Sequence, residues 1–93
     1  MEASRFPNRL RRYRKIAGLS QKQVAKQLGL NDTSPLSRWE KGRVYPSIAN
    51  LFRLCRIYKT IPQELYSDLY QKISSDFVLI ENNLLAQKET LNR

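Results

Sequence analysis

The sequence predicts an all-α fold: five short helices followed by a C-terminal helical extension. Apolar residues recur every three or four positions in successive windows, and no window of comparable length alternates strictly as a strand would. Each of the first three windows ends at a glycine, where a positive φ is sterically easy: Gly18, Gly29 and Gly42. At 93 residues, the chain can bury about a dozen apolar side chains, which is enough for one small domain.

The first two predicted helices span residues 8–17 and 20–28. The apolar positions of the first helix lie at helical spacing: Leu10, Tyr13, Ile16 and Ala17. The second helix begins with a capping box, in which the Ser20 hydroxyl accepts from the Gln23 backbone N–H and the Gln23 side chain reaches back. Its inward-facing residues are Val24, Ala25 and Leu28.

The third predicted helix spans residues 33–41 and follows a polar turn. Asp32 is the expected N-cap, because a carboxylate accepts hydrogen bonds from the free N–H groups of a first helical turn. Pro35 then becomes the third helical residue, where no intrahelical N–H bond is lost. Leu36 and Trp39 share the inner face, and we expect Trp39 to belong to the core.

Ser47 is expected to cap a fourth helix over residues 48–58. Its inward positions are Ile48, Leu51, Leu54, Cys55 and Tyr58. Thr60 and Pro62 open a fifth helix, since proline is well placed in a first turn. The apolar positions then continue in steps of three and four: Leu65, Leu69, Ile73, Phe77, Ile80 and Leu84. This stripe fits one long helix, or two helices broken near residues 74–76, and periodicity does not decide between them.

The charge is distributed unevenly along the chain. Residues 1–60 hold 14 Lys and Arg against three acidic residues, a net +11, whereas residues 61–93 hold three against five, a net −2. The basic front is therefore expected to bind a polyanion. Nucleic acid and an acidic membrane surface both fit this charge, and charge alone does not separate them.

Several functional classes are disfavoured by what the sequence lacks. It contains no histidine and no Gly-rich phosphate loop, so we expect no enzyme activity, no metal and no cofactor. It offers no GXXG loop or evident stacking platform for single-stranded RNA. No run of apolar residues approaches the roughly 18 needed to span a membrane, and no secretory signal precedes the basic front. With a single cysteine, Cys55, the expected location is the reducing cytoplasm.

Many short motifs in fixed order resemble the Cro/repressor-type (XRE-like) helix-turn-helix family. They are Leu10-Arg11, Arg14, Gly18-Leu19-Ser20-Gln21, Val24-Ala25, Leu28-Gly29, Leu36 through Gly42, and Pro46. The resemblance covers residues 8–66 and implies a lambda-repressor-like DNA-binding domain, which leaves residues 67–93 as a C-terminal extension. Between Gly29 and Trp39 the chain has one residue more than the usual family spacing. We place it in the turn, at Leu30 or Asn31.

The resemblance implies a role for individual residues. Helix 33–41 becomes the recognition helix in the DNA major groove. The base-reading candidates are Thr33, Ser34, Ser37 and Arg38. Arg38 has the fork that pairs with guanine O6 and N7, although it is also able to bind only phosphate. The phosphate-binding candidates are Gln21, Lys22, Lys41 and Arg43. Arg14 and Glu40 are expected to form a structural ion pair between the first and third helices.

The predicted function is a sequence-specific, double-stranded DNA-binding transcriptional regulator of bacterial or phage type, acting as a repressor. The alternative is a DNA-binding antitoxin whose acidic tail grips a basic toxin. The apolar stripe of the tail needs a cover. Either it packs back on the first and fourth helices, or it pairs with a second copy to give a homodimer, which is the interpretation we favour.

Overall fold

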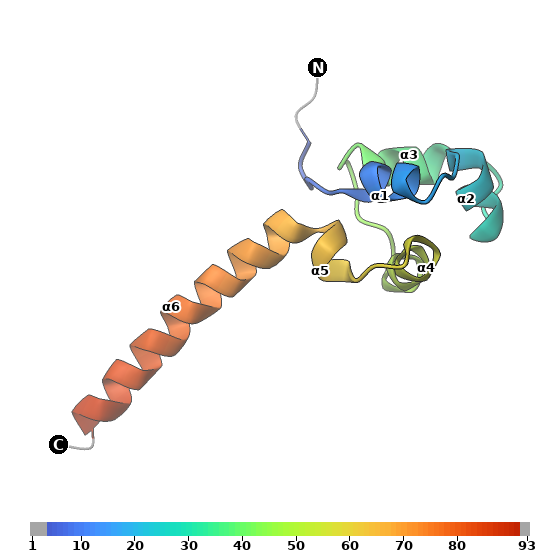
Figure 1. The fold of residues 1–93 in the computed structure, drawn as a ribbon. Coiled ribbons are helices and arrows are strands. Elements are labelled where there is room, and N and C mark those ends of the chain that lie inside the picture. Colours follow the sequence, from blue (N-terminus) through green and yellow to red (C-terminus); the bar gives the residue numbers. More distant parts are fainter. Residues whose placement is uncertain (1–3, 92–93) are drawn as a thin grey trace.

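The computed structural model describes the backbone of residues 4–91 and the side chains of residues 4–88. This part of the chain is helical with no strand, which confirms the all-α prediction. The helices are α1 Leu10–Ile16, α2 Gln21–Gln27, α3 Ser34–Glu40, α4 Ile48–Tyr58, α5 Pro62–Leu65 and α6 Ser67–Leu91. Helices α1 to α5 gather at one end of the molecule, and α6 leaves them as a single rod (Figure 1).

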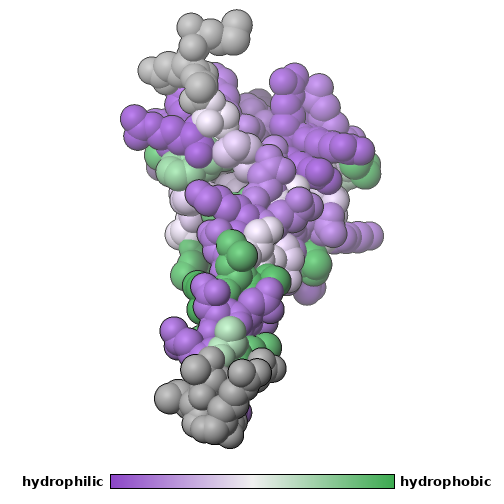
Figure 2. Space-filling model, turned by 90° about the vertical axis from the view of Figure 1, so that its left-hand side faces the viewer, coloured by the Kyte–Doolittle hydropathy of each residue, from purple (hydrophilic) through white to green (hydrophobic). Residues whose placement is uncertain are grey.

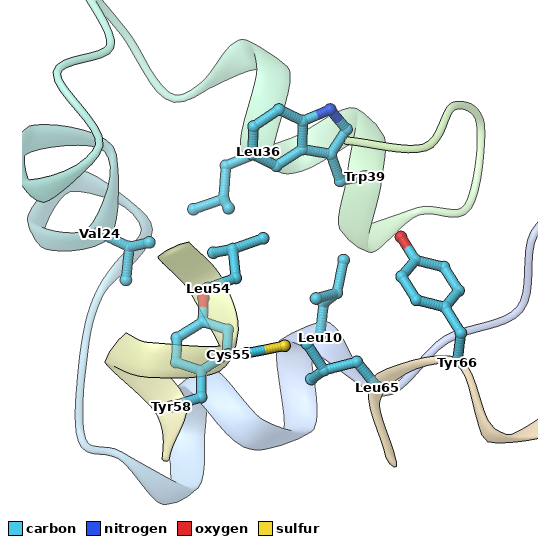
Figure 3. Close-up of a cluster of buried hydrophobic side chains, with 9 residues drawn as sticks. All are labelled: Leu10, Val24, Leu36, Trp39, Leu54, Cys55, Tyr58, Leu65 and Tyr66. Atoms are coloured by element: carbon cyan, nitrogen blue, oxygen red, sulfur yellow. The ribbon is translucent and has the colours of Figure 1, made fainter. Parts of the chain in front are cut away.

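The core lies where the first five helices converge. Its buried residues are Leu10, Val24, Leu36, Trp39, Leu54, Cys55, Tyr58, Leu65 and Tyr66. Figure 3 shows that α3 supplies Leu36 and Trp39 from one side of this cluster, while the side chains of α4 meet them from the other. Trp39 is 6% exposed, so the prediction that it is a core residue is confirmed. This packing fixes α3 in one orientation on the domain, and the opposite face of that helix is left for solvent.

Two predicted helix starts are confirmed by their capping bonds. The Ser20 hydroxyl accepts from the Gln23 N–H at 3.1 Å, and the Ser20 N–H donates to the Gln23 side chain at 2.8 Å, which completes the capping box. At α4, the Ser47 hydroxyl accepts from the Asn50 N–H at 3.1 Å. Each bond satisfies a backbone group that has no partner within its helix.

The expected start of α3 was wrong by one residue. Thr33, not Asp32, occupies the N-cap position, and the helix begins at Ser34, so Pro35 is the second helical residue. The Asp32 carboxylate still accepts the Ser34 N–H at 2.7 Å, but from a turn that precedes the helix. This hydrogen bond, aided by the Ser34 hydroxyl and by the charge of Arg38, lowers the pKa of Asp32.

Two apolar residues that were expected to contribute to packed faces are exposed. Ile48 is 74% exposed because it is the first residue of α4 and lies outside the core in which Leu54 and Tyr58 are buried. Ile16 is 70% exposed because α1 turns Leu10 and Arg14 inward instead. Arg14 occupies the buried position one turn after Leu10, a place that hydrophobic periodicity alone assigns to an apolar residue.

The segment before α1 is fastened to the far end of α3. The carbonyl of Gly42 accepts the N–H groups of Arg5 at 3.1 Å and Phe6 at 2.9 Å. The side-chain amide of Asn8 donates to the carbonyl of Trp39 at 2.8 Å, while its oxygen accepts the Leu10 N–H at 3.0 Å. The start of α1 and the end of α3 are thereby joined through hydrogen bonds that were not predicted from the sequence.

We expect Gly42→Ala to lower the free energy of unfolding more than Gly29→Ala, by about 1–3 kcal/mol, the usual range for overpacking. Both glycines have φ +71°, so both substitutions incur the same left-handed strain. A Cβ at Gly29 meets nothing within 4 Å, whereas at Gly42 it lies 2.7 Å from the carbonyl oxygen of Phe6. Urea unfolding of the two variants measures the difference. Equal losses would contradict the close approach of the N-terminal segment.

Helix α6 is one uninterrupted helix, so the break considered near residues 74–76 is absent; the interruption lies at Tyr66, between α5 and α6. The helix does not pack back on α1 and α4 (Figure 1). The radius of gyration is accordingly 18.0 Å, against about 12 Å for a compact chain of this length. Within the described residues, no helix has the length and apolarity to span a bilayer.

An apolar groove of about 570 Å³ lies where α6 leaves the domain. It is lined by Tyr45, Pro46, Ile48, Leu51, Pro62, Gln63, Tyr66, Leu69, Tyr70 and Ile73. Figure 2 shows hydrophobic side chains at the junction with α6 and along it, whereas hydrophilic side chains dominate the broad part of the molecule above. The apolar surface is therefore concentrated away from the basic front.

Candidate nucleic-acid interface

Helices α2 and α3 are connected by a short turn over residues 28–33 that contains Gly29. Gly29 has φ +71° directly after the C-cap Leu28, a conformation that glycine adopts without a side-chain penalty. Val24 from α2 and Leu36 from α3 are both fully buried in the shared core. Two short helices joined by a tight turn, with the second helix exposed along one side, form the geometry that presents a helix to a DNA groove.

The outer side of α3 displays polar and basic side chains. Ser34 and Arg38 are exposed, and Thr33 and Ser37 are half-buried. Lys41 and Arg43 are exposed just beyond the helix, on either side of Gly42. Because Leu36 and Trp39 hold the opposite side against the core, these side chains have a fixed platform. The predicted base-reading residues thus lie together at the surface of one helix and at its start.

A hollow of about 820 Å³ lies between α1, the start of α2 and one side of α3. Its lining residues are Arg11, Arg14, Ser20, Gln21, Lys22, Thr33, Ser37, Glu40 and Lys41. This hollow brings together three of the four predicted phosphate-binding residues and two of the four predicted base-reading residues. Ser34, Arg38 and Arg43 lie outside its lining. The arrangement is suited to an anion held between cationic side chains and the first turn of α2.

Arg11 and Ser20 also line the hollow, although neither was predicted from the sequence to bind DNA. Arg11 is exposed and lies three residues before Arg14, so both side chains fall on the same side of α1. That spacing is a signal that was available in the sequence. Ser20 was recognised in the sequence only as a helix cap, so its place in the lining of the hollow was not predicted.

Beneath the hollow lies the ion pair that the resemblance predicted. Arg14 Nε donates to Glu40 Oε2 at 2.7 Å, and Arg14 Nη2 donates to Glu40 Oε1 at 3.2 Å. The side chains are 11% and 4% exposed. Arg14 Nη1 also donates to the carbonyl of Leu19 at 3.0 Å, and the hydrogen bonds that Arg14 donates to Glu40 raise the pKa of Arg14. The pair joins α1 to α3 and to the segment that leads into α2.

Gln21 participates in the same network. Its side-chain Nε2 donates to Glu40 Oε1 at 3.0 Å, so its amide is held at the start of α2 with its oxygen left for another partner. The predicted phosphate contact of Gln21 remains a prediction. The structure adds that the orientation of this amide depends on Glu40.

The sequence model of the helix-turn-helix domain family matches residues 6–69, more than two thirds of the chain. The chain belongs to the helix-turn-helix family. Comparison with curated protein sequences and with solved structures gave no significant match. The family match, together with the exposed α3, confirms the resemblance drawn from the sequence and identifies a DNA-binding type of domain.

Within this helix-turn-helix domain, several basic side chains surround the hollow beside α3. The basic residues around the hollow are Arg11, Arg14, Lys22 and Lys41, while Glu40 is the acidic residue in its lining. Because Glu40 is neutralised by Arg14, the hollow presents a net positive surface. Such a surface attracts phosphates over a distance of about a Debye length and is weakened by salt.

Proposed function

We propose that this helix-turn-helix protein is a sequence-specific regulator of transcription that inserts α3 into the major groove of double-stranded DNA and represses the genes it binds. The observation that supports this best is the anchoring of α3 by Leu36 and Trp39, which leaves Arg38 exposed on a rigid helix. The protein would act in the cytoplasm by binding rather than by catalysis.

Two sets of residues would make different kinds of contact with DNA. Arg38, with Thr33, Ser34 and Ser37, would read base edges, and one bidentate Arg–guanine contact is worth about 1–3 kcal/mol of discrimination. Gln21, Lys22, Lys41 and Arg43 would contact phosphates and set the register without reading sequence. The hollow beside α2 is lined by three of the phosphate residues together with Thr33 and Ser37, while Arg38 lies outside it.

We expect Arg38→Ala to reduce the preference for the selected operator over random duplex by about 10- to 100-fold, as loss of one bidentate base contact would. Arg43→Ala is the matched control, an exposed arginine five residues on, and should weaken both duplexes alike. Operators are first selected from random fragments with the purified protein, and affinities are then measured by fluorescence anisotropy. Equal losses on both duplexes for Arg38→Ala would overturn the assignment of the reading residue.

The same titrations over a series of salt concentrations test the phosphate contacts. Each neutralised phosphate contributes about −0.9 to the slope of log affinity against log salt. Lys22→Ala and Lys41→Ala should each make that slope shallower by about one unit. A flat salt response of the unaltered protein would rule out the phosphate-binding surface.

The alternative function, a DNA-binding antitoxin, would use the same DNA-binding domain, α1 to α5. It differs from the repressor only in which protein covers the exposed apolar surface of α6. It is supported by the exposure of that helix and by the net −2 charge of residues 61–93. We favour a homodimer, because the charges along α6 fit a second copy of the chain in one particular orientation.

A further inference from the structure

Helix α6 presents an unusual amount of apolar surface. Each large hydrophobic side chain that the structure describes on this helix, up to residue 88, is between 38% and 62% exposed: Leu69, Tyr70, Ile73, Phe77, Val78, Leu79, Ile80, Leu84 and Leu85. Monomeric proteins rarely leave a contiguous surface of this kind uncovered.

Five of these side chains form a coiled-coil seam. Tyr70, Ile73, Phe77, Ile80 and Leu84 follow one another in steps of three, four, three and four, the alternation of positions a and d in a heptad. We call these five residues the α6 seam. A seam of this spacing packs against another helix with a similar seam, side chain between side chains.

The seam continues into the apolar groove at the base of α6. Tyr70 and Ile73 belong to both, and Tyr66, at the interruption before α6, also lines the groove. A partner helix that follows the seam toward the domain would therefore run into a recess of about 570 Å³ instead of a flat surface. The groove and the seam form one continuous docking surface for a helix.

The charges beside the seam discriminate between the two possible orientations of a second copy. Asp76 is at position g and Glu81 at position e of the same heptad frame. In a parallel dimer, position g of one helix faces position e five residues on in its partner, so Asp76 would face Glu81 twice. Like charges at these positions oppose pairing.

The antiparallel orientation relieves that repulsion. In an antiparallel pair, position e of one helix faces position e of the other, and position g faces position g. One register pairs Phe77 with the partner's Ile80, and the same register pairs Ile73 with the partner's Leu84. In this register Asp76 lies nearest to Asn83 of the partner subunit, and Glu81 lies nearest to Ser74 of the partner subunit. An alternative register pairs Phe77 with the partner's Ile73, but it sets Asp76 against its own copy.

We propose that this protein is a homodimer held by an antiparallel pair of α6 helices, with the segment after Leu84 of each chain lying toward the apolar groove of the other. This inference rests on the regulator function proposed above, because it specifies how two DNA-binding heads, each formed by α1 to α5, are joined. The heads lie at opposite ends of the helix pair, and the starts of the two α6 helices are roughly 35 Å apart at 1.5 Å per residue.

Disulfide cross-linking tests the orientation directly, in the full chain with Cys55→Ala to remove the native thiol. Ile73→Cys and Leu84→Cys variants, which carry tags of different size, are mixed, equilibrated and oxidised. In the antiparallel dimer these positions face each other within the 3.5–4.5 Å that a disulfide requires between Cβ atoms. Each position lies roughly 16 Å along the axis from its own copy. We expect a disulfide between the two variants and none within either variant alone.

Self-linked dimers of either single variant would overturn the antiparallel orientation and establish a parallel one. A monomer in sedimentation at tens of micromolar would overturn the dimer altogether and leave a different protein, such as a toxin, as the cover of α6. Both readouts are taken without DNA, so they fail independently of operator binding. Salt-dependent DNA binding by a monomer would leave the proposed function intact.

A charge placed in the seam gives a second measurement. Phe77→Glu should weaken dimerisation at least about 100-fold, because it buries an unpaired carboxylate between the helices. Leu79→Glu is the matched control, since Leu79 is 62% exposed and lies off the seam at position c. The control should leave the dimer intact, and equal effects of both variants would contradict the seam. Both residues lie outside the core, so the head should remain folded.

Discussion

Glu40→Gln is expected to lower the free energy of unfolding by about 3–5 kcal/mol, the usual effect of removing one partner from a buried ion pair. Three donors converge on the Glu40 carboxylate: Arg14 Nε, Arg14 Nη2 and Gln21 Nε2. A glutamine offers a single acceptor oxygen and turns an NH₂ group toward donors. The buried guanidinium of Arg14 then lacks a counter-charge. Urea unfolding followed by circular dichroism measures the loss.

Two further variants test whether that loss of stability comes from the buried ion pair. Glu64→Gln is the matched control: Glu64 is exposed and accepts only a long 3.3 Å hydrogen bond from Tyr13, so the change should stay within about 0.5 kcal/mol. The double replacement Arg14→Met with Glu40→Leu should recover most of the stability, since an apolar pair removes both buried charges. If Glu40→Gln were as mild as the control, the ion pair would not hold α1 to α3.

The second large effect is alkaline unfolding between about pH 10 and 12. Burial raises the pKa of Tyr58 and of Tyr66 well above the ordinary value of about 10. Above pH 10 the unfolded chain loses the two phenolic protons while the folded chain keeps them. Stability is therefore fully present below pH 10 and falls as the pH rises, by about 1.4 kcal/mol per pH unit for each tyrosine. Unfolding in urea at a series of pH values measures this slope.

Phenylalanine variants identify the residues responsible. Neither hydroxyl has a hydrogen-bond partner among the described residues, so Tyr58→Phe and Tyr66→Phe should be neutral or stabilising at pH 7. Each should also remove about half of the alkaline slope. A slope that persists in the double variant Tyr58→Phe with Tyr66→Phe would show that other groups control alkaline unfolding.

Much of the DNA-binding head could be predicted from the sequence, because its signals are local. Helix starts at Ser20 and Ser47 follow from hydroxyls three residues before the N–H groups they cap. Trp39 and Leu36 follow from helical periodicity. The Arg14–Glu40 pair came instead from the family resemblance, since nothing local indicates that two charges 26 positions apart meet in the interior.

The predictions that were wrong failed for physical reasons that hydrophobic periodicity does not reflect. The expected N-cap at Asp32 was wrong because an aspartate two residues before a helix accepts the same kind of N–H bond from a preceding turn. Ile16 and Ile48 were misplaced because apolar spacing does not indicate which stripe faces the core. The bonds of Asn8 and Gly42 join distant segments through backbone carbonyls, which any residue possesses, so no residue type predicts them.

The aromatic stack at the foot of α6 has a mechanical consequence. Phe6, Tyr45 and Tyr66 pack in sequence, with ring centroids 4.0 Å and 5.3 Å apart, at the place where the chain turns from α5 into α6. A rod of 25 residues is a lever about 37 Å long at 1.5 Å per residue, so a tilt of roughly 10° at its root moves the tip by about 6 Å. In the proposed antiparallel dimer, the packing of these three rings would set how far apart the two DNA-binding domains lie.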